Sequence, residues 1–97
     1  MDSEKLVLFE DYVVTVRGLS PVTARKYAGA VEKCSEILLA AGYRNGNLFQ
    51  AKSIVELGAL KNTLFALPQF QELNTTGHNM YSRGVKTFIS YREASGF

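Results

Sequence analysis

Few residues in this sequence could carry out chemistry, and they are scattered along the chain. The chain has one cysteine, Cys34, and one histidine, His78, and they fall in different predicted elements. No two carboxylates have a spacing that suggests acid–base catalysis. A single cysteine can form neither an internal disulfide nor a cysteine-built zinc site. The sequence therefore predicts that the chain is not an enzyme and has no metal site and no cofactor.

The remaining candidates are basic side chains that could hold phosphate groups. They are Arg17, Arg25, Lys26, Arg83 and Lys86. The net charge is only +2, yet residues 1–16 carry four acidic side chains against one lysine, and residues 17–97 carry ten basic side chains against five acidic ones. Such cations bind a phosphate backbone without reading the base sequence. Solvated helix surfaces have the same pattern, so the sequence leaves both interpretations open.

Helices must position these side chains, because apolar residues recur at intervals of three and four along most of the chain. We expect helices at about residues 3–17, 21–41, 53–67, 68–73 (a short one) and 79–94. The first has an apolar stripe of Leu6, Phe9, Val13 and Val16. The second places Cys34 on its apolar face, where a buried, unreactive thiol is expected. The pattern predicts an all-α bundle of four to five helices.

Residues that start and stop helices lie between these stretches. Gly18 can take the left-handed conformation that closes a helix, and Gly42 can do the same after the second helix. Ser20 can cap the next helix, and Pro21 suits its first position. Ser53 with Glu56 has capping-box spacing, in which each side chain bonds the backbone N–H of the other residue. These signals favour short links between helices.

The second half of the chain has less regular features. We expect Leu48 and Phe49 to cover the edge of the core, and residues 74–78 to form a polar loop that contains His78. In the last helix, Tyr81, Val85, Phe88 and Arg92 fall on one stripe. Gly84 lies near that stripe at a cost of about 1 kcal/mol relative to alanine, which indicates close approach of another helix.

Length and composition exclude several protein classes. With 97 residues, of which 46% are hydrophobic and 21% charged, the chain predicts one globular domain over residues 1–97 and no disordered protein. No apolar run approaches the roughly 20 residues that span a bilayer. The start of the chain lacks the basic and apolar regions of a signal peptide. We therefore expect a cytoplasmic protein without membrane contact.

Part of the sequence resembles a known family. Phe9 and Tyr12, then Gly18-Leu19-Ser20, then Thr23 and Tyr27 are similar to the N-terminal core-binding domain of phage-integrase-type tyrosine recombinases. The match covers about residues 6–40. The stretch from Asn79 to Phe88 is similar to the last helix of such modules. The resemblance implies a SAM-like helical bundle, from a mobile genetic element, that clasps duplex DNA.

The resemblance also implies which activity is absent. The family cuts DNA with residues of a separate C-terminal catalytic domain, and this chain ends at Phe97 before such a domain. We therefore expect DNA binding without cleavage. The resemblance implies Arg25, Lys26, Arg83 and Lys86 as DNA contacts, and Arg17 is included on its charge and position alone. The alternative is a module that binds a protein partner or a second copy of itself. It would use leftover apolar side chains, namely Val7, Val14, Leu39, Tyr43, Phe65 and Phe97.

Overall fold

The first helix, α1 (Ser3–Thr15), ends two residues earlier than its apolar pattern predicts. The structure, a computed structural model, describes residues 3–96. Gly18 has φ 69°, as its position after the helix predicts, and the Leu19 N–H donates to Val13 O at 3.2 Å. Val16 was expected in the buried stripe, but it follows the helix and is 67% exposed. The prediction for Val16 is wrong because the chain has already left the helical path there.

Helix α2 (Pro21–Ala40) begins and ends where its capping residues predict. The Ser20 hydroxyl oxygen accepts the Thr23 N–H at 3.1 Å, and Pro21 occupies the first turn. At the other end Gly42 has φ 97°, a conformation that glycine adopts without steric cost. Cys34 is fully buried. The strongest sequence signals of the chain therefore correspond to local hydrogen bonds and backbone angles.

A short 3-10 turn, η1 (Leu48–Gln50), connects α2 to α3 (Ile54–Ala66). Leu48 and Phe49 are buried, as expected. Ser35 of α2 fixes this turn, because its buried hydroxyl accepts the Leu48 N–H at 3.0 Å and donates to Val31 O. These two bonds give the hydroxyl both a donor and an acceptor partner, without which its burial would be costly.

The capping of α3 differs in one partner from the capping-box prediction. The Ser53 hydroxyl accepts the Glu56 N–H at 3.0 Å, as expected. The Glu56 carboxylate instead accepts the N–H of Lys52 at 3.1 Å, one residue before the cap. The extended backbone at Ser53 (φ −152°) presents the preceding N–H to the carboxylate. Both bonds still fix the chain where it enters the helix.

The expected loop over residues 74–78 is partly helix. Helix α4 (Pro68–Thr76) continues through Asn74, and α5 (Met80–Ala94) starts after a three-residue turn. Two side chains explain the extension. The Thr76 hydroxyl donates to Glu72 O within the helix, and the Asn74 side-chain oxygen accepts the Ser82 N–H of α5. Polar residues that usually favour loops are thus satisfied in helical conformation.

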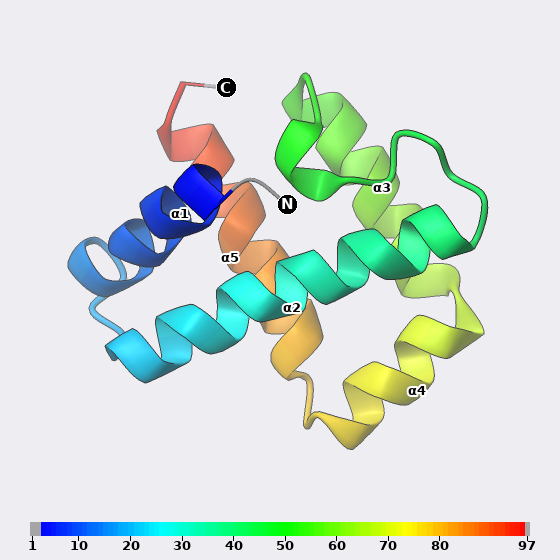
Figure 1. Cartoon of the computed structure of the whole chain (residues 1–97), viewed down its shortest axis with the longest axis horizontal. Helices are drawn as coiled ribbons and strands as arrows, with labels where there is room; N and C mark the ends of the chain where they lie inside the picture. The colour runs from blue at the N-terminus through cyan, green and yellow to red at the C-terminus, as the bar shows by residue number, and fades with distance from the viewer. Residues whose placement is uncertain (1–2, 97) are drawn as a thin grey trace.

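Helix α2 lies at the centre of the bundle and contacts every other element (Figure 1). Helix α5 crosses it at Gly84, where an added Cβ atom would lie 3.1 Å from the Ala30 Cβ atom and 3.3 Å from Tyr27 O. This close approach confirms the packing role expected for Gly84. The rings of Phe9 and Phe49 both meet Phe88 of α5 edge-on, at centroid distances of 5.2 and 4.9 Å.

The described residues form an all-α bundle with no strand. The Cα radius of gyration is 12.4 Å, close to the roughly 13 Å of a compact 100-residue domain. Arg92, expected on the apolar stripe, is half-buried and donates to Phe49 O at 3.2 Å and to Ala51 O at 3.4 Å. Phe97 lies outside the described residues.

Candidate nucleic-acid interface

The five basic residues singled out in the sequence are all exposed, but they lie on different parts of the bundle. Arg17 lies in the link between α1 and α2. Arg25 and Lys26 follow one another in the first turns of α2, and Arg83 and Lys86 are one turn apart on α5. Their grouping therefore depends on how the helices pack.

Lys86 belongs to a cluster of cations around an aromatic ring. Its ammonium nitrogen lies 6.0 Å from the centroid of the Phe65 ring, and that of Lys61 lies 5.8 Å from the same centroid. The Phe65 ring is stacked on Phe70 of α4, with centroids 4.9 Å apart and 6° between the planes. Both ammonium groups therefore lie within about 6 Å of the same ring, the range of a cation–π contact.

Arg83 lies beside the crossing of α5 and α2. It directly precedes Gly84, where α5 crosses α2, and Lys26 directly precedes Tyr27, whose carbonyl oxygen Gly84 approaches. Arg83 and Lys26 therefore flank the same helix crossing. We define the α5 basic face as Lys26, Lys61, Arg83 and Lys86, with the Phe65 ring.

Few acidic side chains accompany the α5 basic face. Glu93 is the acidic residue of α5, and Glu56 is that of α3. Glu93 lies two turns beyond Lys86 toward the end of α5. The Glu56 carboxylate caps the start of α3 by accepting the Lys52 N–H. Helices α3 and α5, which supply three of the four cations of the face, therefore together carry more basic than acidic side chains.

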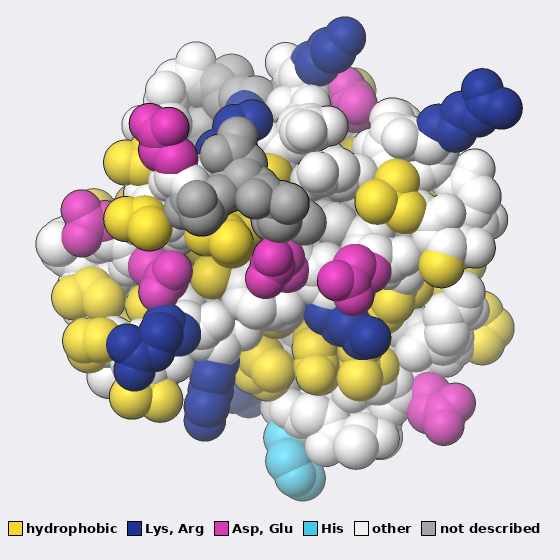
Figure 2. All heavy atoms as spheres, in the orientation of Figure 1, with side chains coloured by type: hydrophobic (Ala, Val, Ile, Leu, Met, Phe, Trp, Pro, Cys, Tyr) yellow, Lys and Arg dark blue, Asp and Glu magenta, His cyan; other side chains and the backbone are white. Residues whose placement is uncertain are grey.

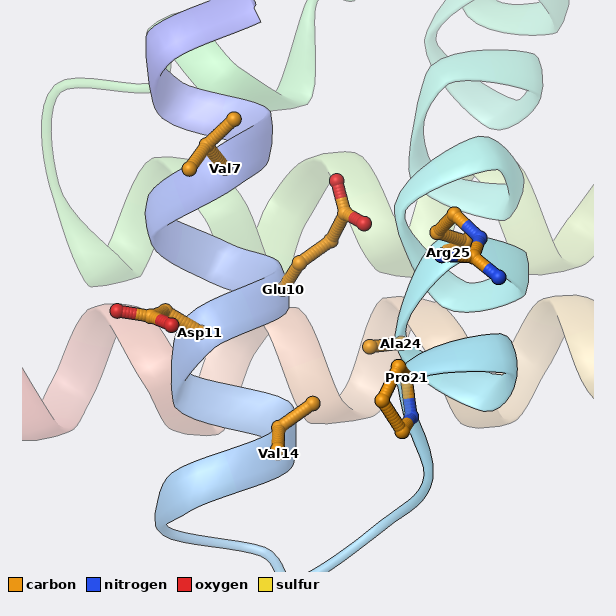
Figure 3. A pocket seen from close by; sticks show the side chains of 7 residues that line it. All are labelled: Val7, Glu10, Asp11, Val14, Pro21, Ala24 and Arg25. Atoms are coloured by element: carbon orange, nitrogen blue, oxygen red, sulfur yellow. The ribbon is translucent and has the colours of Figure 1, made fainter.

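Arg25 lies in a different environment from Lys26, because neighbours in a helix point about 100° apart. It lines a groove of about 320 Å³ between α1 and α2 (Figure 3). Two acidic side chains of α1, Glu10 and Asp11, line the same groove, and the Glu10 side chain points toward α2. The Glu10 carboxylate, directed toward the helix that carries Arg25, disfavours a phosphate there. The structure thus separates Arg25 from the α5 basic face.

Cys34 and His78 differ sharply in exposure. The Cys34 thiol is fully buried, and burial raises its pKa to about 12. The thiolate that would act as a nucleophile is therefore disfavoured at neutral pH. His78 is exposed in the turn between α4 and α5, with φ 54°.

Burial also affects one basic residue outside the α5 basic face. It lowers the pKa of the Arg92 guanidinium, which bonds backbone carbonyls beside η1. Arg92 thus connects α5 to the turn and contributes to the structure of the bundle.

Sequence inspection missed Lys61 and Phe65 as partners of the predicted cations. Their spacing of four residues places them on one side of α3 and was available as a signal. Their proximity to Lys86 depends on the packing of α3 against α5, which no local pattern indicates.

Among residues 3–96, no group of three or more histidine, cysteine, aspartate or glutamate side chains is placed to hold a metal ion. Within the same residues, every helix is too short or too polar to cross a lipid bilayer.

Comparison of the chain with protein-family models, with curated proteins and with solved structures finds no match.

Proposed function

We propose that this chain is a non-enzymatic module that binds duplex DNA by its phosphate backbone, through the α5 basic face. The observation that carries the proposal is the pair of lysines, Lys61 and Lys86, whose ammonium groups lie near the same Phe65 ring. Arg83 and Lys26 add positive charge next to the residues at which α5 crosses α2. Cations of this kind neutralise phosphates and contribute affinity without base recognition. The proposed compartment is the cytoplasm.

The sequence resemblance to the core-binding domain of tyrosine recombinases supports the same function. Gly18-Leu19-Ser20, part of the pattern that carries the resemblance, forms the tight link and the cap between α1 and α2. A helical bundle also occurs in proteins with many other functions, so the choice of DNA rests on the charges. The proposed binding is weak and independent of base sequence.

The proposal is tested by fluorescence-anisotropy titration of a labelled duplex of about 30 base pairs, at about 50 mM and about 200 mM salt. Wild type is compared with Arg83→Ala/Lys86→Ala and with a control of equal net charge, Arg44→Ala/Lys52→Ala. The control residues are exposed and lie in the link between α2 and α3.

We expect the Arg83→Ala/Lys86→Ala variant to lose affinity at low salt and to reduce the slope of log K against log salt by about two. The control variant should keep the wild-type slope within about 0.5, because its removed charges lie outside the α5 basic face. Equal losses in both variants would mean that only net charge attracts the duplex. Absence of binding at about 50 mM salt would exclude the function. The labelled duplex should stay uncut throughout.

A further inference from the structure

Exposed apolar side chains gather where α1 meets the start of α2. Val7 of α1 is 61% exposed and Val22 of α2 is 52% exposed. In Figure 2, hydrophobic side chains alternate with acidic ones over α1, and hydrophobic and basic ones lie over the start of α2. An apolar surface of this kind is typical of a contact with another macromolecule.

The groove between the two helices lies in this surface, and it has two chemically different walls. The α1 wall has Val7 and Val14 two helical turns apart, with the acidic residues Glu10 and Asp11 between them. The α2 wall has Pro21, Ala24 and the guanidinium of Arg25. Among the described residues, none of the three charged groups takes part in an ion pair. Opposite charges on the two walls thus remain available to an occupant.

The distribution of charge in the groove indicates which kind of molecule could bind there. A purely cationic helix would be repelled by Arg25, and a purely anionic one would be repelled by Glu10 and Asp11. A second copy of this chain carries both signs on the same two walls. When two such surfaces meet across a two-fold axis, each residue contact occurs twice, so the surface must complement itself.

We propose that the chain forms a two-fold symmetric homodimer through the α1–α2 groove. Arg25 of each copy pairs with Glu10 and Asp11 of the other, and the exposed valines of the two copies cover one another. The few apolar residues available indicate a weak dimer, with a dissociation constant in the micromolar range or above, about −8 kcal/mol or weaker. This dimer is independent of DNA and uses none of the cations of the α5 basic face.

Sedimentation velocity without DNA, from about 5 µM to about 500 µM protein, tests the dimer directly. Val7→Asp is compared with Val55→Asp, which places the same charge at a valine of α3 that is 79% exposed. We expect wild type and Val55→Asp to dimerise with rising concentration and Val7→Asp to stay monomeric. Helical circular dichroism verifies that each variant is folded.

A charge exchange tests the pairing itself. Arg25→Glu alone, and Glu10→Lys/Asp11→Lys alone, place like charges against one another and should each be monomeric. An equal mixture of the two should restore dimers, because the introduced glutamate of one chain then faces the introduced lysines of the other. In the same mixed dimer, the unchanged Arg25 of the second chain faces the native carboxylates of the first.

Three outcomes would overturn the proposal. They are wild-type monomers at every concentration, equal effects of Val7→Asp and Val55→Asp, and a mixture of the charge variants that stays monomeric. The DNA titration changes other residues than the dimer experiments do. If one proposal fails, the other can therefore still be tested.

Discussion

At the scale of single residues, Gly84 sets how closely α5 approaches α2. A side chain there would meet the Ala30 Cβ atom and the Tyr27 carbonyl oxygen. Gly29 of α2 provides a matched comparison, because an added Cβ atom there meets nothing within 4 Å. The same substitution at Gly84 and at Gly29 therefore distinguishes the effect of packing on stability from the effect of helix propensity.

We predict that Gly84→Val lowers the free energy of unfolding by about 1–3 kcal/mol, since the helices must move apart. Gly29→Val should change it by less than about 0.5 kcal/mol, because valine has a slightly better helix propensity than glycine. Urea denaturation followed by circular dichroism measures both values. Equal effects of the two substitutions would show that α5 does not pack tightly at Gly84.

Cys34 makes stability depend on pH in the alkaline range. In the unfolded chain its thiol titrates near pH 9.0, whereas in the folded chain burial raises the pKa to about 12. The folded state therefore holds the proton more tightly between these values. The full contribution to stability is present below pH 9 and is lost progressively as pH rises toward 12.

We predict that the free energy of unfolding contributed by Cys34 falls by about 1.4 kcal/mol per pH unit above about pH 9. Lysines and tyrosines also titrate in this range, so the wild-type slope is compared with that of Cys34→Ala. The difference between the two slopes of unfolding free energy against pH gives the contribution of the Cys34 thiol. The free energies are measured by urea denaturation at a series of pH values. Equal slopes for wild type and Cys34→Ala would contradict the prediction.

At the scale of elements, the turn between α4 and α5 contains two consecutive non-glycine residues with positive φ. His78 has φ 54° and Asn79 has φ 67°. The Asn79 side-chain oxygen accepts a bond from the Asn74 side chain, which helps to hold its conformation. His78 is exposed and has no such bond among the contacts of the described residues. The backbone strain of the turn is therefore best tested at His78.

We predict that His78→Gly is more stable than His78→Ala by about 1 kcal/mol, since only glycine adopts this conformation without steric cost. At Gln69, an exposed position in α4, the order should reverse, with alanine more stable than glycine by about 1 kcal/mol. Thermal denaturation of the four variants measures the two differences. The same order at both positions would exclude strain at His78.

The boundaries of the elements could be predicted where one residue determines the local backbone. Gly18, Ser20 and Gly42 have the angles and bonds that their types suggest. Prediction was wrong at Asn74, where composition favours a loop. The bond from the Ser82 N–H to the Asn74 side chain comes from α5, so no local pattern could indicate it.

At the scale of the whole molecule, the candidate site was harder to predict than the fold. Arg25 and Lys26 are adjacent in sequence and both were predicted to contact phosphate, yet helical geometry points them toward different neighbours. Arg25 lines a groove with carboxylates of α1. Which helix covers which side of α2 depends on packing across the whole chain, and this decides the charge around each cation.

The central position of α2 predicts an order of local stability. This helix contacts every other element and buries seven residues from Ala24 to Leu38, whereas Phe70 is the buried residue of α4. Opening of α2 therefore requires disruption of the entire core. We predict slowest amide hydrogen exchange in the middle of α2 and fast exchange in α4. Comparable protection in the two helices would contradict this order.

Because the Cys34 thiol is buried in that same helix, the rate at which it reacts with a reagent depends on how often α2 separates from the core. A thiol-reactive dye can modify Cys34 only when α2 separates from the core, since the chain has no other cysteine. Any molecule that binds the closed form reduces the open population by the factor 1 + [L]/Kd. The rate at which the dye labels Cys34 in the otherwise unmodified chain should therefore fall if the proposed duplex or the proposed second copy binds, and neither partner needs a label of its own.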